Sequence, residues 1–131
     1  MQDVRWKQRF SNYVSAYKLL GDAVRLKHPS ELETEGMIQR FEYTFELGWK
    51  TLKDYLEEKG FAEVVGSKDA IRLAFASGVI SNGEVWMEMI NDRSLTSHLY
   101  DSGVAQLIAG NVVNKYYPAF SQLYNFLLDK Q

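Results

Sequence analysis

The stretch that decides the fold is Phe41-Glu-Tyr-Thr-Phe-Glu-Leu-Gly-Trp-Lys-Thr-Leu-Lys-Asp-Tyr-Leu56, with the ten residues before it. Apolar side chains recur in it at three- and four-residue steps, which places them on one face of an α-helix. This stripe consists of Met37, Phe41, Thr44 or Phe45, Gly48, Leu52 and Tyr55 or Leu56. The pattern predicts a long helix from about Glu31 or Thr34 to Lys59, with Gly60 as its left-handed end.

Gly48 lies inside the apolar stripe, where glycine costs up to about 1 kcal/mol relative to alanine. We therefore expect the backbone of a neighbouring helix that carries a bulky aromatic side chain to pass close to it. On another face, acidic and basic residues follow at four-residue steps, and Glu46 before Lys50 has the favourable orientation for an ion pair. This ladder is either a solvated face or a polar surface that meets a partner or the functional site.

The rest of the chain shows the same helical periodicity and no strand-like alternation. The remaining helices are expected at about Val4 to Lys27, at Lys68 to Ala76 with Ser67 as N-cap, from Ser81 or Asn82 onward, and from Asp101 or Ser102 to the end, with Pro118 dividing the last one after Lys115 or Tyr116. These elements predict an all-α fold. We expect an up-and-down antiparallel bundle of about five helices, forming a single domain over residues 1–131.

Composition limits the function. The chain has 131 residues, 46% of them hydrophobic and 24% charged, as in soluble globular domains. Its net charge of −2 gives no general basic field, so any contact with RNA must be local. The absence of cysteine excludes disulfides and fits a reducing cytoplasm. No apolar run approaches the roughly 18 residues of a membrane span, so we expect a cytoplasmic protein.

Several kinds of chemistry are disfavoured. Two histidines and no cysteine argue against a zinc site, and we expect neither a metal nor a cofactor. Gly66-Ser67 resembles the opening of a nucleotidyltransferase signature, but the segment from Ala74 to Ile80 offers no carboxylate to hold magnesium. The chain is therefore not expected to be a nucleotidyltransferase by itself.

The segment from Glu84 to Asp101 begins as an amphipathic helix and then becomes crowded with polar side chains. Serine, threonine, asparagine and aspartate are poor helix formers, so this composition indicates a site. His98 can move a proton near neutral pH, and Arg93 can hold phosphate oxygens and offset developing charge. These two residues suffice in principle for metal-free RNA cleavage. Asn91 and Ser97 are candidates for binding substrate.

Arg93 and His98 lie five residues apart, or roughly 140° apart around a regular helix. They converge only if the helix is distorted, if the arginine bends round, or if a second copy supplies residues across a twofold axis. We favour a homodimer. The structural alternatives are that Arg93 pairs with Asp92 or Glu88, and that His98 bonds Asp101 or a backbone carbonyl.

Three stretches carry a resemblance to a known family: Phe41–Leu56, Ser67–Phe75 and Trp86–Tyr100. They resemble the nucleotidyltransferase substrate-binding family of the HEPN superfamily, in matching order over nearly the whole chain. The resemblance implies a dimeric helical bundle similar to the helical domain of kanamycin nucleotidyltransferase. It also implies a partner, a minimal nucleotidyltransferase encoded nearby, which would supply the missing acids.

The resemblance also implies roles for particular residues. Arg93 and His98 match the ribonuclease signature of the superfamily, with Asp92 as an assisting neighbour. Tyr100 matches a tyrosine to which, in related toxins, the partner nucleotidyltransferase adds AMP and so silences the ribonuclease. Glu46 and Lys50, together with Trp49, match the family's second-helix motif and are candidates for substrate binding.

Two functions of different classes remain open, besides a plain dimerisation scaffold. In the first, the chain is a binding subunit that presents a nucleotide or another substrate to a separate nucleotidyltransferase, in a two-gene module like a toxin–antitoxin pair. In the second, it is a metal-independent endoribonuclease toxin that uses Arg93 and His98 and is silenced by AMP addition at Tyr100.

Overall fold

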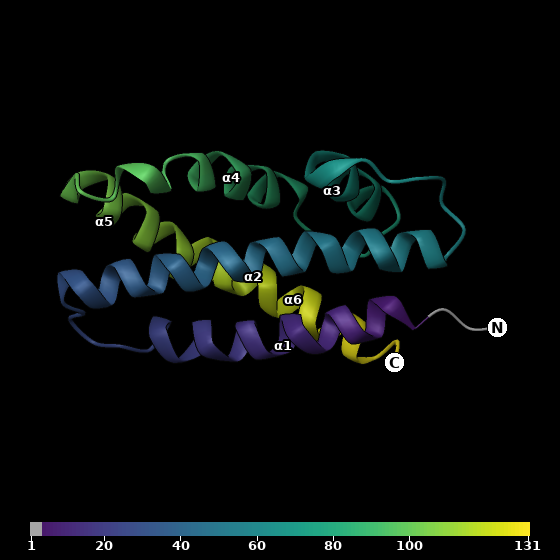
Figure 1. Cartoon of the computed structure of the whole chain (residues 1–131), viewed down its shortest axis with the longest axis horizontal. Coiled ribbons are helices and arrows are strands. Elements are labelled where there is room, and N and C mark those ends of the chain that lie inside the picture. Colours follow the sequence, from purple (N-terminus) through teal and green to yellow (C-terminus); the bar gives the residue numbers. More distant parts are fainter. Residues whose placement is uncertain (1–3) are drawn as a thin grey trace.

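The computed structural model describes residues 4–131, and helices are the only regular elements in this part of the chain (Figure 1). In order they are α1 (Arg5–Val24), α2 (Glu31–Glu58), α3 (Gly66–Ala76), α4 (Gly83–Ser94), the 3₁₀ turn η1 (Thr96–His98), α5 (Ser102–Asn111), the π-helical turn η2 (Val112–Tyr116) and α6 (Tyr117–Leu128). The predicted all-α class is confirmed. None of the helices in residues 4–131 has the length and apolar character of a membrane span.

The long helix α2 is the axis of the bundle. In Figure 1, α1 runs along one side of it and α3 and α4 along the other, while α5 and α6 cross it. Its start is fixed by a capping box, in which the Ser30 hydroxyl accepts from the Glu33 N–H at 3.1 Å and the Glu33 carboxylate accepts from the Ser30 N–H at 2.9 Å. Its end is followed by Gly60 at φ +97°, as predicted.

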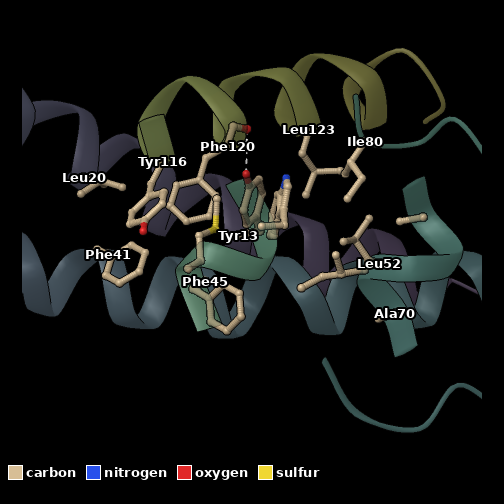
Figure 2. Close-up of a cluster of buried hydrophobic side chains, with 14 of the residues drawn as sticks. Tyr13, Leu20, Phe41, Phe45, Leu52, Ala70, Ile80, Tyr116, Phe120 and Leu123 are labelled. Atoms are coloured by element: carbon tan, nitrogen blue, oxygen red, sulfur yellow. Dashed lines mark hydrogen bonds between the residues drawn. The ribbon is translucent and has the colours of Figure 1, made fainter. Parts of the chain in front are cut away.

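Aromatic rings fill the core between α2 and the last helix (Figure 2). The rings of Phe41 and Tyr116 stack with centroids 5.1 Å apart. The Tyr13 ring lies edge-on to Phe120, and its buried hydroxyl donates to the Phe120 carbonyl oxygen at 2.7 Å. This hydrogen bond satisfies a polar group that would otherwise be costly to bury.

Gly48 is a point of close approach, as expected, but the neighbours are side chains rather than a backbone. A Cβ at this position would lie 3.1 Å from a ring carbon of Tyr13 and 3.3 Å from one of Trp86. The two rings come from α1 and α4 on either side of α2. Gly48 therefore lets both helices pack against α2 at the same level.

Two predicted boundaries were wrong. The first helix ends at Val24 rather than near Lys27. The residue before Pro29 cannot stay in the α-helical region, and His28 adopts φ +54°. Ser67 is not the N-cap of the third helix, which begins one residue earlier. The N-cap residue is Val65, which has no side-chain capping bond, and the Asp69 carboxylate in the first turn accepts from the Val65 N–H at 2.9 Å.

The division of the last helix was predicted correctly. The turn η2 separates α5 from α6 and ends at Tyr116, two residues before Pro118. Proline has no N–H to donate, and its ring crowds the carbonyl four residues earlier. A wider π turn accommodates both effects without ending the helical path.

The Gly48 contact gives a prediction. Gly48→Leu should lower the free energy of unfolding by about 1–3 kcal/mol, because the new side chain must displace the Tyr13 and Trp86 rings. Gly36→Leu in the same helix is the matched control, since a Cβ at Gly36 meets no atom of the described chain within 4 Å. This control should gain up to about 1 kcal/mol from helix propensity. Urea unfolding measures both, and equal changes would contradict the packing argument.

Candidate functional site

The polar segment is not one continuous helix. α4 starts at the Asn82 cap, whose side chain accepts from the Val85 N–H at 3.3 Å, and it ends at Ser94. The turn η1 follows, and the Asp101 carboxylate then caps α5 by accepting from the Gly103 N–H at 2.9 Å. Part of the polar composition therefore serves to end one helix and begin the next.

Arg93 reaches across to α2. Its Nη2 lies 3.3 Å from Glu46 Oε1, an ion pair that neither predicted alternative for Arg93 named. Glu46 also accepts from the Trp49 Nε1–H at 3.2 Å and lies 3.8 Å from Lys50 Nζ, which confirms the predicted Glu46–Lys50 pair. The Arg93 side chain is 40% exposed, while its buried Nε has no hydrogen-bond partner in the described chain. The polar segment of α4 and the charged face of α2, which the sequence indicated separately, thus meet at the carboxylate of Glu46.

Asp92, the neighbour of Arg93 in the sequence, is buried instead of lying in an open groove. It is only 5% exposed, and its Oδ2 accepts from the Tyr116 hydroxyl at 2.6 Å and from Asn111 Nδ2 at 2.8 Å. Burial, followed by the bond to Asp92, raises the pKa of Tyr116 above its ordinary value of 10.0. The residue next to Arg93 is therefore tied to α5 and η2, and these bonds fix the backbone from which the arginine extends.

Asn111 was not predicted as part of this network. Asn111 is one of the few amide side chains in the apolar stretch that follows Asp101, and this was the available signal. The ring of Tyr116 follows the apolar periodicity of the C-terminal segment, which is typical of a core residue. Nothing in the local pattern of either residue indicates a contact with Asp92, because the partners lie 19 and 24 residues away.

His98 and Tyr100 form an exposed pair at the end of η1. His98 Nδ1 lies 3.2 Å from the Tyr100 hydroxyl, and the rings meet edge to face with centroids 5.9 Å apart. Tyr100 is 83% exposed. The helix is broken between Arg93 and His98, which was one of the three conditions considered for their convergence, yet no hydrogen bond or ion pair joins these two residues within residues 4–131. The pairing of these two residues across a twofold axis stays a prediction.

The two remaining candidate residues, Ser97 and Asn91, do not belong to the Arg93–Glu46 pair or to the His98–Tyr100 pair. Ser97 is exposed in η1. Asn91 is also exposed and lines a cavity of about 920 Å³ between α3 and α4, whose walls include Phe75 and Met87. A smaller cavity of about 200 Å³ lies between the start of α2 and α5 and includes Tyr100. Arg93 and His98 line neither of these two cavities.

The structure is that of a small helical bundle in which a glutamate of the second helix holds an arginine and a histidine–tyrosine pair is exposed. The sequence model of the family described as "Nucleotidyltransferase substrate binding protein like" matches residues 8–129. The chain belongs to this family, which confirms the resemblance found in the sequence.

Individual proteins support the same assignment. The chain is 31% identical over 81 residues to a curated protein of Haemophilus influenzae named "Probable ribonuclease HepT", a match that spans 59% of this chain and 56% of that protein. A crystal structure of a Thermus thermophilus protein superposes with a TM-score of 0.80 and 36% identity, covering 86% of this chain and 96% of that one.

A second solved structure shows likeness of fold. It is a Haemophilus influenzae protein described as revealing the fold of a substrate-binding domain of a nucleotidyltransferase. The TM-score is 0.76 at 24% identity, and the superposition covers 91% of this chain and 98% of that one. The arrangement of helices is thus shared over nearly the full length.

The Asp92 network gives a prediction with a defined pH dependence. Tyr116→Phe should lower the free energy of unfolding near pH 7 by about 1–3 kcal/mol, because the buried Asp92 loses a hydrogen bond. The pKa of Tyr116 is raised in the folded protein. The stability that its neutral hydroxyl contributes is therefore complete below pH 10.0 and is lost as the pH rises above that value. Urea unfolding at several pH values should therefore show the difference between wild type and variant shrinking above pH 10.0.

Tyr100→Phe provides the control, since it removes a hydroxyl from an exposed ring and should change stability by less than about 0.5 kcal/mol. A difference between wild type and Tyr116→Phe that stays constant up to strongly alkaline pH would contradict this account.

Proposed function

We propose that this chain is a metal-independent ribonuclease that works with a separate minimal nucleotidyltransferase, and that the surface of Arg93, His98 and Tyr100 is its active region. The observation that carries the proposal is the exposed pair of His98 and Tyr100 at the end of η1, which follows the partly exposed Arg93 at the end of α4. The name of the Haemophilus influenzae relative, "Probable ribonuclease HepT", supports it.

The chemistry follows from the side chains of His98 and Arg93. His98 accepts the proton of a ribose 2′-hydroxyl, and the 2′-oxygen forms a bond to phosphorus. The bond from phosphorus to the 5′-oxygen of the next nucleotide breaks, and this oxygen takes a proton from water. The products are a 2′,3′-cyclic phosphate and a 5′-hydroxyl. Arg93 offsets the negative charge that builds up on the phosphate oxygens in the transition state. Because Glu46 holds the guanidinium in the free protein, the RNA phosphate must compete with this carboxylate.

The shape of the surface favours a large substrate. Sites for small molecules are concave and enclose most of the ligand. Arg93 and His98 line neither the cavity between α3 and α4 nor the one beside Tyr100, and His98 is exposed. An extended polymer can lie across such a surface and reach both groups. Local contact of this kind is also consistent with the net charge of −2.

Tyr100 is the proposed point of control. Its phenol is 83% exposed, so the active site of another enzyme can reach it. AMP added to the phenol oxygen would place a phosphate 3.2 Å or little more from the His98 ring and would occupy the position of the RNA backbone. The separate nucleotidyltransferase would supply the acids that this chain lacks.

Cleavage of a defined RNA in the presence of EDTA tests the ribonuclease. His98→Ala and Arg93→Ala should each reduce the cleavage rate by at least about 100-fold, because they remove the proton acceptor and the transition-state cation. His28→Ala and Arg72→Ala are matched controls at exposed positions elsewhere and should cleave at the wild-type rate. Circular dichroism confirms that each variant is folded.

Intact RNA with wild-type protein, or cleavage that survives in His98→Ala, would refute the ribonuclease. The products can also be identified by mass spectrometry, and the proposed attack requires a 2′,3′-cyclic phosphate end or the 2′- or 3′-phosphate that forms when this end is hydrolysed.

Intact-mass analysis of the chain isolated from its native cells tests the role of Tyr100. We expect a population heavier by one AMP unit, with the added mass on the peptide that contains Tyr100. Tyr100→Phe should lack this population and should keep its ribonuclease activity, because the phenol takes no part in the cleavage step. Modification at Tyr43 or at another tyrosine instead would contradict the assignment.

The second candidate is the non-catalytic binding subunit, and the cavity between α3 and α4 favours it. Its volume of about 920 Å³ suits a small ligand, and its walls combine Phe75 and Met87 with the polar Asn91. In this alternative, the chain binds a substrate, as the family description states, and presents it to the separate nucleotidyltransferase. Intact RNA, together with nucleotide binding that Phe75→Ala weakens, would favour this function over the ribonuclease.

A further inference from the structure

The start of α1 carries positive charge where a helix does not favour it. Of the charged residues in α1, four are basic and only Asp22 is acidic, although the whole chain has a net charge of −2. Arg5, Lys7 and Arg9 all lie in the first five residues of α1, and its first turn contains no acidic residue. The positive end of the helix dipole disfavours cations at this end. The stability of α1 therefore gives no reason for this charge.

Polar side chains on one face of the same segment line a small cavity. Four of them occur at the i, i+3, i+4 and i+7 positions of a helix and therefore share a face: Arg5, Gln8, Arg9 and Asn12. Together with Asp54 of α2 they line a cavity of about 270 Å³. Guanidinium and amide groups are common donors to the phosphates and base edges of nucleic acids. The composition of α1 at this cavity therefore suits an anionic ligand that accepts hydrogen bonds.

Arg9 is held in the same manner as Arg93. Its Nε donates to Asp54 Oδ2 at 2.8 Å, and this carboxylate side chain is only 10% exposed. Within residues 4–131 Arg9 makes no other hydrogen bond or ion pair, so both of its Nη groups can bind a ligand. The side chains of Arg9 and Arg93 are each 40% exposed. Two arginines, from α1 and α4, are thus each oriented by a carboxylate of α2.

The two carboxylates lie on the same side of α2. Glu46 and Asp54 are eight residues apart, which is about 12 Å along the helix and about 80° around it. Lys50 lies halfway between them, is 44% exposed and pairs with Glu46 at 3.8 Å. Because α1 and α4 flank α2 on opposite sides (Figure 1), the line from Arg93 past Lys50 to Arg9 crosses α2 obliquely. Cations from three helices therefore follow one another along the charged ladder of α2.

We propose that the cavity beside Arg9 is a second phosphate-binding subsite, which holds the RNA strand whose reacting phosphate lies at Arg93. Arg9 donates from its Nη groups to the phosphate oxygens while Asp54 keeps its Nε, so the guanidinium is oriented before the RNA binds. The exposed Gln8 and Asn12 offer amide groups to the sugar and base next to this phosphate. The inference rests on the proposed ribonuclease only for the position of the reacting phosphate, because a strand can bind without being cleaved.

The separation of the two arginines sets the length of RNA that uses this subsite. They are about 12 Å apart along α2 and roughly one helix diameter of 10 Å apart across it, which is on the order of 15 Å in all. A strand of several nucleotides spans this distance. A dinucleotide has a single phosphodiester and cannot bind at both arginines. Arg9 should therefore matter only for the longer substrates.

Binding of an RNA that cannot be cleaved tests the subsite. The probe is a labelled single strand of about ten nucleotides with 2′-O-methyl groups, which leave no hydroxyl to attack. In fluorescence anisotropy, Arg9→Gln should raise Kd at least about fivefold. It should also lower the slope of log Kd against log salt concentration by about 0.7, since one phosphate contact is lost.

Arg25→Gln is the matched control for this measurement. Arg25 also pairs with an acidic residue, Asp22, at 3.5 Å, but it lies sixteen residues after Arg9 and about 160° around the helix from it. This variant should change neither Kd nor the salt slope.

The length of the substrate tests how the subsite serves cleavage. With an RNA of about ten nucleotides, Arg9→Gln should raise KM by the factor measured for Kd and should leave kcat unchanged, because Arg9 does not reach the reacting phosphate. With a dinucleotide, the ratio of the KM values of variant and wild type should fall to about one. An ion pair that only joins α1 to α2 would change the free energy of unfolding and would affect both substrates alike.

Circular dichroism shows whether Arg9→Gln is folded, since the substitution leaves the Asp54 carboxylate without its partner. The double variant Arg9→Gln, Asp54→Asn has no unpaired carboxylate and should bind the RNA probe as weakly as the single variant. A Kd and a salt slope equal to those of Arg25→Gln in both variants would overturn the proposal.

These outcomes are separable from those of the ribonuclease assay. If wild-type protein leaves RNA intact while Arg9→Gln weakens binding of the probe, the subsite is correct and the ribonuclease is not. If wild type cleaves RNA and Arg9→Gln changes neither Kd nor KM, the ribonuclease stands and the subsite is refuted.

Discussion

The buried carboxylate of Asp92 is the constraint on which the site depends. A carboxylate that is only 5% exposed is tolerated only when hydrogen bonds replace its lost water, and Tyr116 and Asn111 supply them. Asn111 is the last residue of α5 and Tyr116 the last residue of η2, so the end of α4 is held in one position relative to this part of the chain. The next residue along the chain is Arg93, whose direction is thereby set by a contact on another face of α4.

The arginine is then held from a third helix. Glu46 on α2 pairs with Arg93 and also accepts from the Trp49 indole, so the carboxylate itself is fixed. In the proposed ribonuclease, an arginine that is already oriented would lose less conformational freedom when a phosphate replaced the glutamate. The same pairing would weaken the attraction of the free surface for other anions.

Much of the fold could be predicted from the sequence, and the reasons are local. The stripe in α2, the cap at Asn82 and the division near Pro118 all follow from periodicity and backbone chemistry within a few residues. The site could be predicted only in part. Arg93, His98 and Glu46 were recognised one by one, whereas the partners of Arg93 and Asp92 could not be, because these contacts depend on how distant helices pack.

The π turn between α5 and α6 has a consequence for how this chain can vary in length. A π turn contains one residue more than the α-helical turn that it replaces, and each residue of a helix turns the chain by about 100°. Removing a residue between Val112 and Tyr116 would regularise the helix but swing the phenol away from Asp92 by that angle. The length of this short segment is therefore fixed by a side chain on a different helix, and we expect insertions and deletions among homologues to fall elsewhere.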